Sequence, residues 1–305
     1  MNEIVVSVQN LKKYYSDIKA IDDISFSIKE KEIFGIIGSN GAGKTTAIEC
    51  MAGMKAFDEG KIDILGLDVV KNGARLKNRI GLQQQESEIP ERLRLKDAML
   101  LFSSFYDYVL DWQKLLKDLN LWDKREVMYS SLSGGQKKRF FVAMALLGDP
   151  EIVFLDELTS GLDPQSRRSV WSLIKNLREQ GRTIVLSTHY MDEAENLCDR
   201  VAIIDKGKLF ALDSPENLIL QYGGFTRVQF RISEPFESNV LCNLDGVENI
   251  SFNEDICFVN ISDKSAIVEI VKYLDGIKQG LEYFTITSPS LEDVFLNITG
   301  REVRN

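Results

Sequence analysis

The sequence predicts an α/β fold, in which short buried strands alternate with helices, followed by a smaller α+β unit. Three short, mainly apolar segments carry this prediction, namely Ile33–Ile37, Ile152–Glu157 and Thr183–Thr188. Apolar runs of this length, bounded by turn residues, are typical of strands buried on both faces of a sheet. The first two are each followed by a turn and a helical pattern, so we expect strands that are connected through helices.

Composition places the chain among globular proteins. With 305 residues, of which 44% are apolar, it is long enough to bury a core. The longest apolar stretch, Phe140–Leu147, is too short to cross a bilayer, and the N-terminus lacks a secretory signal pattern. We therefore expect a soluble protein, and the four cysteines, which have no metal-ligand spacing, indicate reduced thiols in the cytosol. A net charge of −9 counts against nucleic acid as a partner.

An antiparallel flap is expected beside the strand Ile33–Ile37. Ile4–Val8 and Ile24–Ile28 alternate between apolar and polar residues, as strands with one buried face do. Tyr14 and Tyr15 lie between them. At most one of the two can stack on an adenine ring, because neighbouring side chains of an extended segment point in opposite directions. Packing on the flap is the alternative for both.

A glycine-rich segment follows Ile33–Ile37 directly and opens a helical pattern. The order of strand, turn and helix, with the spacing G-x-x-x-x-G-K-T, is that of a phosphate-binding P-loop. Glycines let backbone N–H groups surround the phosphates, and the helix N-terminus adds partial positive charge. Lys44 would reach the β- and γ-phosphates and Thr45 would ligate Mg²⁺, whereas a turn that only caps the helix is the alternative. The predicted nucleotide site comprises Gly38, Ser39, Asn40, Gly41, Ala42, Gly43, Lys44, Thr45 and Thr46.

Three consecutive glutamines, Gln83, Gln84 and Gln85, end a later predicted strand. A glutamine at such a place can ligate Mg²⁺ or the attacking water, and can respond to the γ-phosphate. The local sequence does not distinguish among the three. A solvated polar loop is the alternative.

A helical subdomain, about residues 88–148, is expected to be inserted into the α/β core, because its apolar residues recur at three- and four-residue steps. We expect most of its aromatic residues in a core and some along a groove for a partner helix. It ends at Leu132–Gln136, where Ser133 has the position of a helix N-cap and Gly134 and Gly135 leave backbone N–H groups exposed. This pattern predicts a second anion site, and a simple N-cap is the alternative.

Two carboxylates end the apolar strand that begins at Ile152. Asp156 stands where an aspartate holds the Mg²⁺ of a P-loop nucleotide, and Glu157 is placed to orient and deprotonate the attacking water. Capping of a turn is the alternative for such a pair. The chain then turns into a helix near Gln165, with Asp163 as the expected cap.

His189, the single histidine of the sequence, stands at the end of Thr183–Thr188. A lone histidine is more often a surface or core residue. Open α/β sheets, however, bind ligands at the carboxyl ends of their strands, which favours a contact from His189 to the γ-phosphate.

A second unit is expected after Gly223–Gly224. We divide the chain into a nucleotide-binding domain, residues 1–222, and a small α+β domain, residues 225–305. The latter has no catalytic constellation and is interpreted as a regulatory or dimerisation module, with an inert extension as the alternative. Its predicted strands are 226–232, 250–252, 256–259 and 283–287, and its predicted helix is 266–274.

Together these motifs resemble the nucleotide-binding subunit of an ATP-binding cassette (ABC) transporter. The resemblance covers about residues 1–220. It implies a P-loop NTPase fold of the ABC type, with a RecA-like core, an antiparallel β flap and an inserted helical subdomain, and an ATPase that uses ATP and Mg²⁺. The motifs, in the order of the family, are Gly38–Thr46, Gln85, Leu132–Gln136, Leu155–Glu157, Ser160–Asp163 and His189.

The resemblance also implies roles for single residues. Tyr15 would stack on adenine, and Gln85 would be the glutamine that approaches Mg²⁺. Ser133–Gln136 would be the signature segment, Asp163 the D-loop residue and His189 the switch histidine.

The chain departs from the family pattern at three positions. Ser39, Gln84 and Leu158 stand where proline is frequent. Leu158 would loosen the loop that positions Glu157 and so affect the hydrolysis rate. The segment Ser288–Glu302 resembles the ending of bacterial exporter ATPases that serve antibiotic resistance, lantibiotic immunity and sodium extrusion.

Partners follow from the same resemblance. The signature segment of one subunit closes on the ATP held by the P-loop of another, so we expect a head-to-tail homodimer. A separate integral membrane permease would export a drug, antibiotic, peptide or ion, and would hold the chain at the cytoplasmic face of the membrane. The Gln85 loop and the helical subdomain would transmit motion to it. No nucleic acid is expected as a partner.

The main alternative is a soluble non-transport ABC ATPase that acts as a regulatory or nucleic-acid-associated motor. A chromosome or repair ATPase would carry a long coiled coil between Lys44 and Ser133, and the sequence has no sustained heptads there. A translation-type ATPase would carry two cassettes on one chain. A nucleotide sensor without turnover would lack Glu157.

Overall fold

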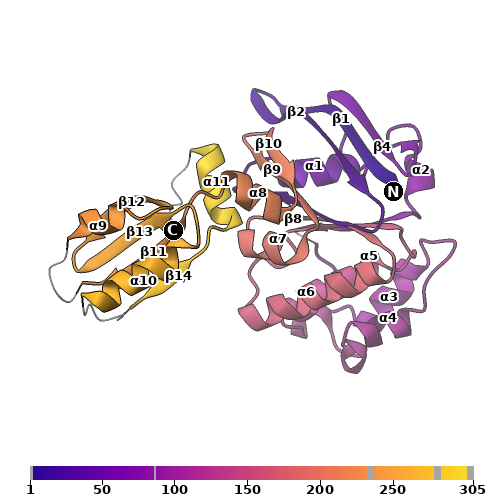
Figure 1. Cartoon of the computed structure of the whole chain (residues 1–305). Coiled ribbons are helices and arrows are strands. Elements are labelled where there is room, and N and C mark those ends of the chain that lie inside the picture. The colour runs from indigo at the N-terminus through magenta and orange to yellow at the C-terminus, as the bar shows by residue number, and fades with distance from the viewer. Residues whose placement is uncertain (1–2, 86, 233–236, 278–282, 301–305) are drawn as a thin grey trace. The chain divides into compact units, whose positions relative to one another are not determined.

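The computed structural model describes residues 3–85, 87–232, 237–277 and 283–300, and Figure 1 shows the order of its elements along the chain. The chain divides into two compact units, Met1–Pro215 and Glu216–Asn305. This division lies on the N-terminal side of the linker expected at Gly223–Gly224. Among the described residues, no helix combines the length and the apolar character needed to cross a membrane.

The flap of the first unit is a four-stranded sheet in the order β2-β1-β4-β5, in which β1 is antiparallel to β2 and β4. Its first two strands are longer than the sequence predicted. Tyr14 and Tyr15 therefore lie inside a strand rather than between strands, because the pairing continues to the pair Tyr15 and Ile18. The strands are β1 (Ile4–Tyr15), β2 (Ile18–Lys29), β4 (Glu59–Ile64) and β5 (Leu67–Asp68).

The central sheet of the first unit has six strands in the order β10-β9-β3-β8-β7-β6. Five are parallel, and β10 is antiparallel to β9 at one edge. The carboxyl ends of β3, β7 and β8 therefore meet at one edge of the sheet, which brings three of the predicted motifs together. The strands are β3 (Ile33–Ile37), β6 (Ile80–Gln83), β7 (Ile152–Asp156), β8 (Thr183–Thr188), β9 (Arg200–Asp205) and β10 (Lys208–Asp213).

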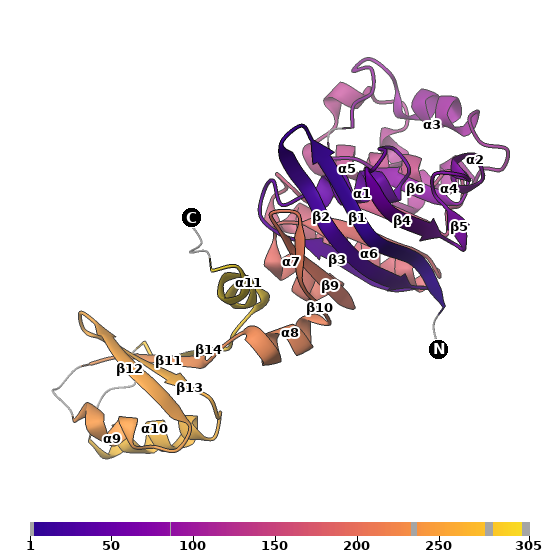
Figure 2. The same ribbon diagram turned by 90° about the horizontal axis from the view of Figure 1, so that it is seen from above.

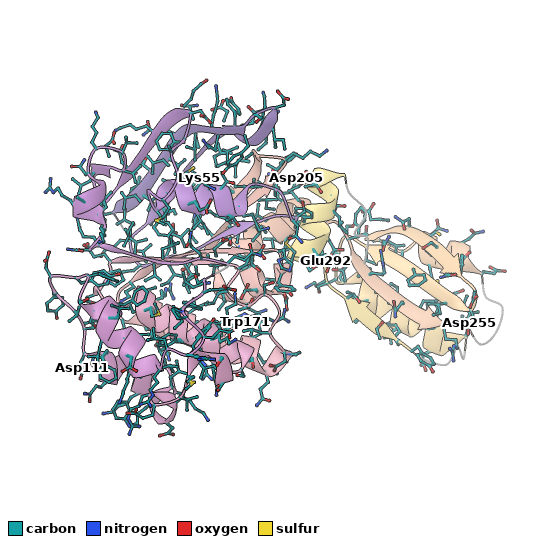
Figure 3. All side chains as sticks on the ribbon, turned by 180° about the vertical axis from the view of Figure 1, so that it is seen from behind. Lys55, Asp111, Trp171, Asp205, Asp255 and Glu292 are labelled. Carbon is teal, nitrogen blue, oxygen red and sulfur yellow. The ribbon has the colours of Figure 1, made fainter. Side chains whose placement is uncertain are left out.

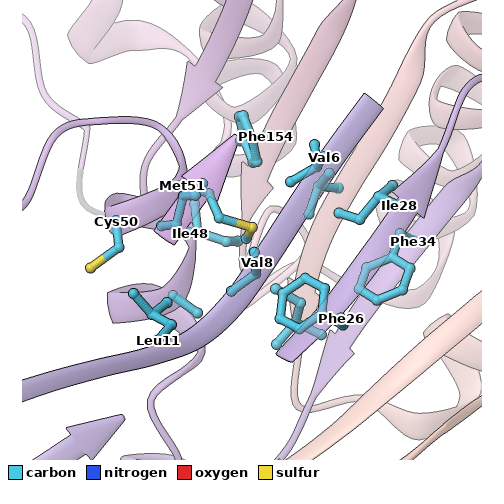
Figure 4. Packing of buried hydrophobic residues seen from close by; sticks show 14 of the residues in the cluster. Val6, Val8, Leu11, Phe26, Ile28, Phe34, Ile48, Cys50, Met51 and Phe154 are labelled. Carbon is cyan, nitrogen blue, oxygen red and sulfur yellow. The ribbon is translucent and has the colours of Figure 1, made fainter. Parts of the chain in front are cut away.

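Helices cover both faces of the central sheet. Helix α1 (Lys44–Met51) contacts β7 and β8 of this sheet and β2 of the flap. Helix α6 (Pro164–Glu179) contacts β8, and α7 (Met191–Leu197) contacts β3 and β8. The flap, α1 and the central sheet enclose one apolar core, which includes Ile48 and Phe154 (Figure 4). A short helix, α2 (Gly73–Leu76), precedes β6.

The helical subdomain lies beside this core (Figure 1). The six aromatic residues on the N-terminal side of Tyr129 do not lie in the core, although we expected most of them there: Phe102, Tyr106, Trp112 and Trp122 are half-buried, and Phe105 and Tyr108 are exposed. Its core is instead aliphatic together with the aromatic residues of α5. The helices are α3 (Leu95–Ser103), α4 (Trp112–Asp118) and α5 (Gly134–Ala145), with 3-10 turns at Trp122–Lys124 and Tyr129–Ser131.

The second unit contains a four-stranded antiparallel sheet in the order β12-β13-β11-β14 (Figure 2). Buried side chains of this sheet, such as Phe230, pack with Ile270 and Leu274 of α10. Helices α9 and α11 were not predicted. The elements are α8 (Pro215–Tyr222), β11 (Thr226–Arg231), α9 (Ser238–Cys242), β12 (Val247–Asn253), β13 (Ile256–Ile261), α10 (Ala266–Gly276), β14 (Thr285–Thr287) and α11 (Leu291–Thr299).

Candidate nucleotide-binding site

A pocket of about 480 Å³ lies at the N-terminus of α1. Asn40, Gly41 and residues 43–46 form one side of it, and residues 18–20 of the flap form another. Gly43 has a φ of 104°, and a Cβ atom there would lie 2.3 Å from the carbonyl oxygen of Ala20, so only glycine fits. The remaining lining residues are Gln85, Glu157, Ser160 and His189. We call this cavity the P-loop pocket.

Lys44 is held inside the P-loop by its own backbone. Its Nζ atom donates to the carbonyl oxygens of Gly38 at 3.0 Å and Ser39 at 3.1 Å. The same atom lies 3.2 Å from Oε1 of Glu157, and the two side chains are only 4% and 7% exposed. A buried cation at a helix N-terminus that opens into a pocket is suited to bind phosphate oxygens.

Asp156 is buried next to Thr45, which lines the P-loop pocket, and is not itself among the described lining residues. The Thr45 hydroxyl donates to Oδ1 of Asp156 at 3.2 Å, and the Ser187 hydroxyl donates to the same oxygen. Burial raises the pKa of Asp156, and the hydrogen bonds from Ser187 and Thr45 oppose this shift. Carboxylate and hydroxyl oxygens are hard ligands of the kind that Mg²⁺ prefers, so the pair fits this ion.

Glu157 occupies a left-handed backbone conformation, with a φ of 44°. Its N–H group donates to the Ser187 hydroxyl at 3.1 Å and to the Ser187 carbonyl oxygen at 3.2 Å. Three groups surround its carboxylate: the Lys44 ammonium, the Gln85 amide, which donates to Oε2 at 3.3 Å, and Nδ1 of His189, 3.4 Å from Oε1. The fold thus gathers the predicted base and its expected neighbours around one point.

The three glutamines at the end of β6 and directly after it divide between two cavities. Gln83, which is buried, and Gln84 both line a separate groove that is described below, whereas Gln85 lines the P-loop pocket.

Comparisons with known proteins agree with this geometry. The family model described as "ABC transporter" matches residues 21–160. The chain is 31% identical over 311 residues to the linearmycin resistance ATP-binding protein LnrL of Bacillus subtilis (strain 168), covering 99% of this chain and 100% of that protein. It is 32% identical over 308 residues to the Nod factor export ATP-binding protein I of Rhizobium sp. (strain N33), covering 99% of each. The chain belongs to the ABC transporter family.

Solved structures support the same assignment. The structure of CbiO1 of Clostridium perfringens, part of an ABC transporter complex, is similar to this chain with a TM-score of 0.65 and 25% sequence identity. The aligned region covers 71% of this chain and 91% of CbiO1. A dimeric ATP-binding cassette in a post-hydrolysis state with ADP and Pi shares the fold, with a TM-score of 0.62 at 24% identity, over 68% of this chain and 98% of its own. The chain is therefore an ATP-binding ABC subunit with the nucleotide-binding fold of this family.

The signature segment of this ABC subunit does not join the P-loop pocket within one chain. Ser133 caps α5 by accepting from the N–H of Gln136, and Gln136 accepts in return from the N–H of Ser133 at 2.9 Å. Ser133 and Gly134 are exposed. Asp163 caps α6 by accepting from the N–H groups of Gln165 and Ser166. Neither Ser133–Gln136 nor Asp163 is among the described residues that line the pocket.

Tyr15 is also outside the described lining of the P-loop pocket. It lies at the end of β1 and is 39% exposed. The ammonium groups of Lys13 and Lys55 lie 5.4 and 5.2 Å from its ring centroid. Adenine stacking on Tyr15 stays a prediction.

Several residues of the site were not predicted from the sequence. Ser187 forms hydrogen bonds with both Asp156 and Glu157, and the sequence signal for it is a hydroxyl that follows the apolar residues of β8, two positions before His189. Residues 18–20 line the pocket only because β2 begins at Ile18, which the local pattern did not reveal. Conversely, Gly38, Ser39 and Ala42 shape the loop without lining the pocket.

Proposed function

We propose that this ABC subunit binds ATP with Mg²⁺ in the P-loop pocket and hydrolyses it to drive export through a separate membrane permease. The observation that carries the proposal is the position of the Glu157 carboxylate, which follows β7 and lies among Lys44 of the P-loop, Gln85 and His189. A carboxylate in such a place can accept a proton from water that attacks a γ-phosphate.

ATP would be held mainly by backbone and Lys44. The N–H groups of residues 41–46 and the N-terminus of α1 provide partial positive charge for the phosphates. The buried Lys44 ammonium, which contacts Glu157 in this structure, would instead contact the β- and γ-phosphates when ATP is bound. Residues 18–20 form the opposite wall, and Tyr15 at the adjacent strand end is the proposed adenine platform.

Mg²⁺ would be held by Thr45, Asp156 and Gln85. Thr45 and Asp156 already share a hydrogen bond, and both are oxygen donors next to the P-loop. When bound, the ion would neutralise part of the negative charge on the β- and γ-phosphate oxygens. Ser187 keeps the Asp156 carboxylate oriented, so this chain fixes the ligand before the ion arrives.

Hydrolysis would depend on the water held by Glu157. The two hydrogen bonds from its N–H group to Ser187 fix the backbone of Glu157 at the end of β7. Its carboxylate would orient the water and take its proton, while His189 contacts the γ-phosphate. Leu158, which follows Glu157 in place of the frequent proline, is only 3% exposed, so packing holds the loop in this chain.

A complete site would need two chains. Ser133 and Gly134 are exposed at the N-terminus of α5, and the described lining of the P-loop pocket includes none of Ser133–Gln136. A second copy, arranged head to tail, would place this helix end against the γ-phosphate, with Asp163 of each copy beside the shared interface. ATP then acts as the link between the copies, and hydrolysis releases them.

A groove of about 630 Å³ is the proposed permease site. It lies between α3, α5, β6 and the turn after α1, and its walls include Phe102, Tyr106, Phe141 and Met144. Gln84 lines this groove while the next residue, Gln85, lines the P-loop pocket. An amphipathic helix of the permease would fit there, and the two neighbouring glutamines would transmit changes between the cavities.

The location and the second unit complete the proposal. The chain would sit at the cytoplasmic face of the membrane, attached through the permease, with the cargo selected by that partner. The relatives named above serve linearmycin resistance and Nod factor export, which favours export over a regulatory or nucleic-acid-associated role. We assign the ATP-binding domain to residues 1–222 and a regulatory or dimerisation role to residues 225–305.

Nucleotide-dependent dimerisation tests this proposal. The mass of the Glu157→Gln chain is measured by light scattering with Mg²⁺ and ATP, alone and combined with Ser133→Arg. We expect a dimer that Ser133→Arg abolishes and that ADP does not support. Ser172→Arg, at an exposed position of α6, is the control and leaves the dimer intact. Dimers that persist with Ser133→Arg would contradict the head-to-tail arrangement.

A further inference from the structure

The turn between β9 and β10 is built tightly around two residues. Lys206 and Gly207 both have left-handed backbone conformations, with φ values of 48° and 75°. This is the pattern of a two-residue hairpin turn that matches the twist of its strands. Asp205, the last residue of β9, precedes the turn and is only 2% exposed (labelled in Figure 3).

This turn contacts the P-loop at two places. The Ser39 hydroxyl donates to Oδ1 of Asp205 at 3.2 Å, and the N–H of Gly207 donates to the carbonyl oxygen of Ala42 at 3.0 Å. Ser39 in turn accepts from Nζ of Lys44 through its carbonyl oxygen. The buried carboxylate is thus connected through one residue to the lysine that faces the phosphates.

The same turn contacts the flap wall of the P-loop pocket. The N–H of Asp22 donates to the carbonyl oxygen of Gly207 at 2.8 Å. A Cβ atom on Gly207 would lie 2.9 Å from the carbonyl oxygens of both Lys19 and Ala20, which line the pocket. The backbone of the turn therefore fits against the flap closely enough that a larger residue at Gly207 would displace that wall.

We propose that Asp205 is a positioning residue for ATP binding, which acts through Ser39 and, with the β9–β10 turn, fixes the P-loop and the flap wall relative to each other. The role rests on the function proposed above, and Asp205 itself touches no nucleotide. The connection is made by the side chains of Ser39 and Asp205.

A small set of variants isolates the contact. Asp205→Ala removes the acceptor, Asp205→Asn keeps an acceptor oxygen of the same shape, and Ser39→Ala removes only the donor. Glu32→Ala is the matched control: Glu32 is a buried carboxylate at the amino end of β3, where it accepts from the N–H of Lys29 at 2.7 Å and contacts Arg200. It lies at the opposite end of that strand from the P-loop.

Affinities for ATP with Mg²⁺ and thermal unfolding without nucleotide are measured for every variant. We expect Asp205→Ala and Ser39→Ala each to weaken ATP binding by about tenfold relative to wild type. The double variant should lose no more ATP affinity than either single variant, and Asp205→Asn should bind ATP within about twofold of wild type. Glu32→Ala lowers the unfolding temperature but leaves the affinity unchanged. If Asp205→Ala fails to fold, Ser39→Ala alone decides the question by the same criterion.

The measurements distinguish an error in the positioning role of Asp205 from an error in the proposed ATP-binding function. The positioning role alone is overturned if the wild-type chain binds ATP and Ser39→Ala binds it with unchanged affinity. It is also overturned if the losses of ATP affinity from the two single variants add in the double variant. A wild-type chain that binds no ATP overturns the proposed function and this role together.

Discussion

Removal of the Ser187 hydroxyl gives a sharp test of how the acidic end of β7 is held. Ser187 donates to Oδ1 of Asp156 and accepts from the N–H of Glu157 at 3.1 Å. Ser187 and Asp156 are each 1% exposed, so water does not replace a lost bond. Ser187→Ala deletes one oxygen and leaves the rest of β8 unchanged.

The size of the effect follows from these contacts. A hydrogen bond to a charged group contributes about 1.5–3 kcal/mol, and the N–H of Glu157 keeps its second acceptor, the Ser187 carbonyl oxygen at 3.2 Å. We therefore expect the free energy of unfolding of the first unit to fall by about 2 kcal/mol. For a unit of this size that corresponds to about 4–8 °C in unfolding temperature.

Thermal unfolding and ATP hydrolysis together provide the assay. Hydrolysis should also fall, by about tenfold, because the left-handed backbone of Glu157 loses one of its restraints and its carboxylate shifts. Ser172→Ala is the control, since this exposed hydroxyl only donates to the carbonyl oxygen of Arg168 on the same helix. A Ser187→Ala chain with an unfolding temperature within about 1 °C of wild type would refute the reasoning.

Three further predictions concern other parts of the chain. Burial raises the pKa of Glu193 above its ordinary value of 4.5, so the folded chain loses stability as pH rises above that value and the carboxyl group ionises. In Glu193→Gln the side chain stays neutral and can still accept a hydrogen bond from Trp171. The unfolding temperature of this variant should therefore exceed that of the wild type above pH 4.5 and equal it below. Phe230→Ala should lower the free energy of unfolding of the second unit by about 3–5 kcal/mol and leave the first unit unchanged in urea unfolding, because Phe230 is fully buried. Lys44→Met should weaken ATP binding by about a hundredfold in a titration with labelled ATP, while Lys137→Met should not, because Lys137 is a half-buried lysine of α5 that is not in the described lining of the P-loop pocket.

The buried strands and their motifs could be predicted because their signals are local. Ile33–Ile37 and Thr183–Thr188 are apolar runs bounded by turn residues, and the structure has strands with the same bounds. The N-caps at Ser133 and Asp163 could be predicted for the same reason, since a cap depends on a few neighbouring residues.

Features that depend on distant pairing could not be predicted. The flap strands extend to Tyr15 and from Ile18 because they pair with each other across bulges, and the residues there are mostly polar. The tie between Ser39 and Asp205 joins segments far apart in the sequence, and neither residue shows it locally. We expected most aromatic residues of the helical subdomain in a core and some along a groove, yet Phe105 and Tyr108 are exposed, because both lie in the loop between α3 and α4.

The rate of ATP hydrolysis by the purified chain, measured with and without Glu157→Gln in the presence of Mg²⁺, tests the central claim most directly. The account predicts that the wild-type chain turns over ATP, and that the variant binds ATP but does not hydrolyse it, because only the proton acceptor is lost. A Glu157→Gln chain that hydrolyses ATP at the wild-type rate would contradict the account, since the carboxylate among Lys44, Gln85 and His189 would then have no part in the reaction.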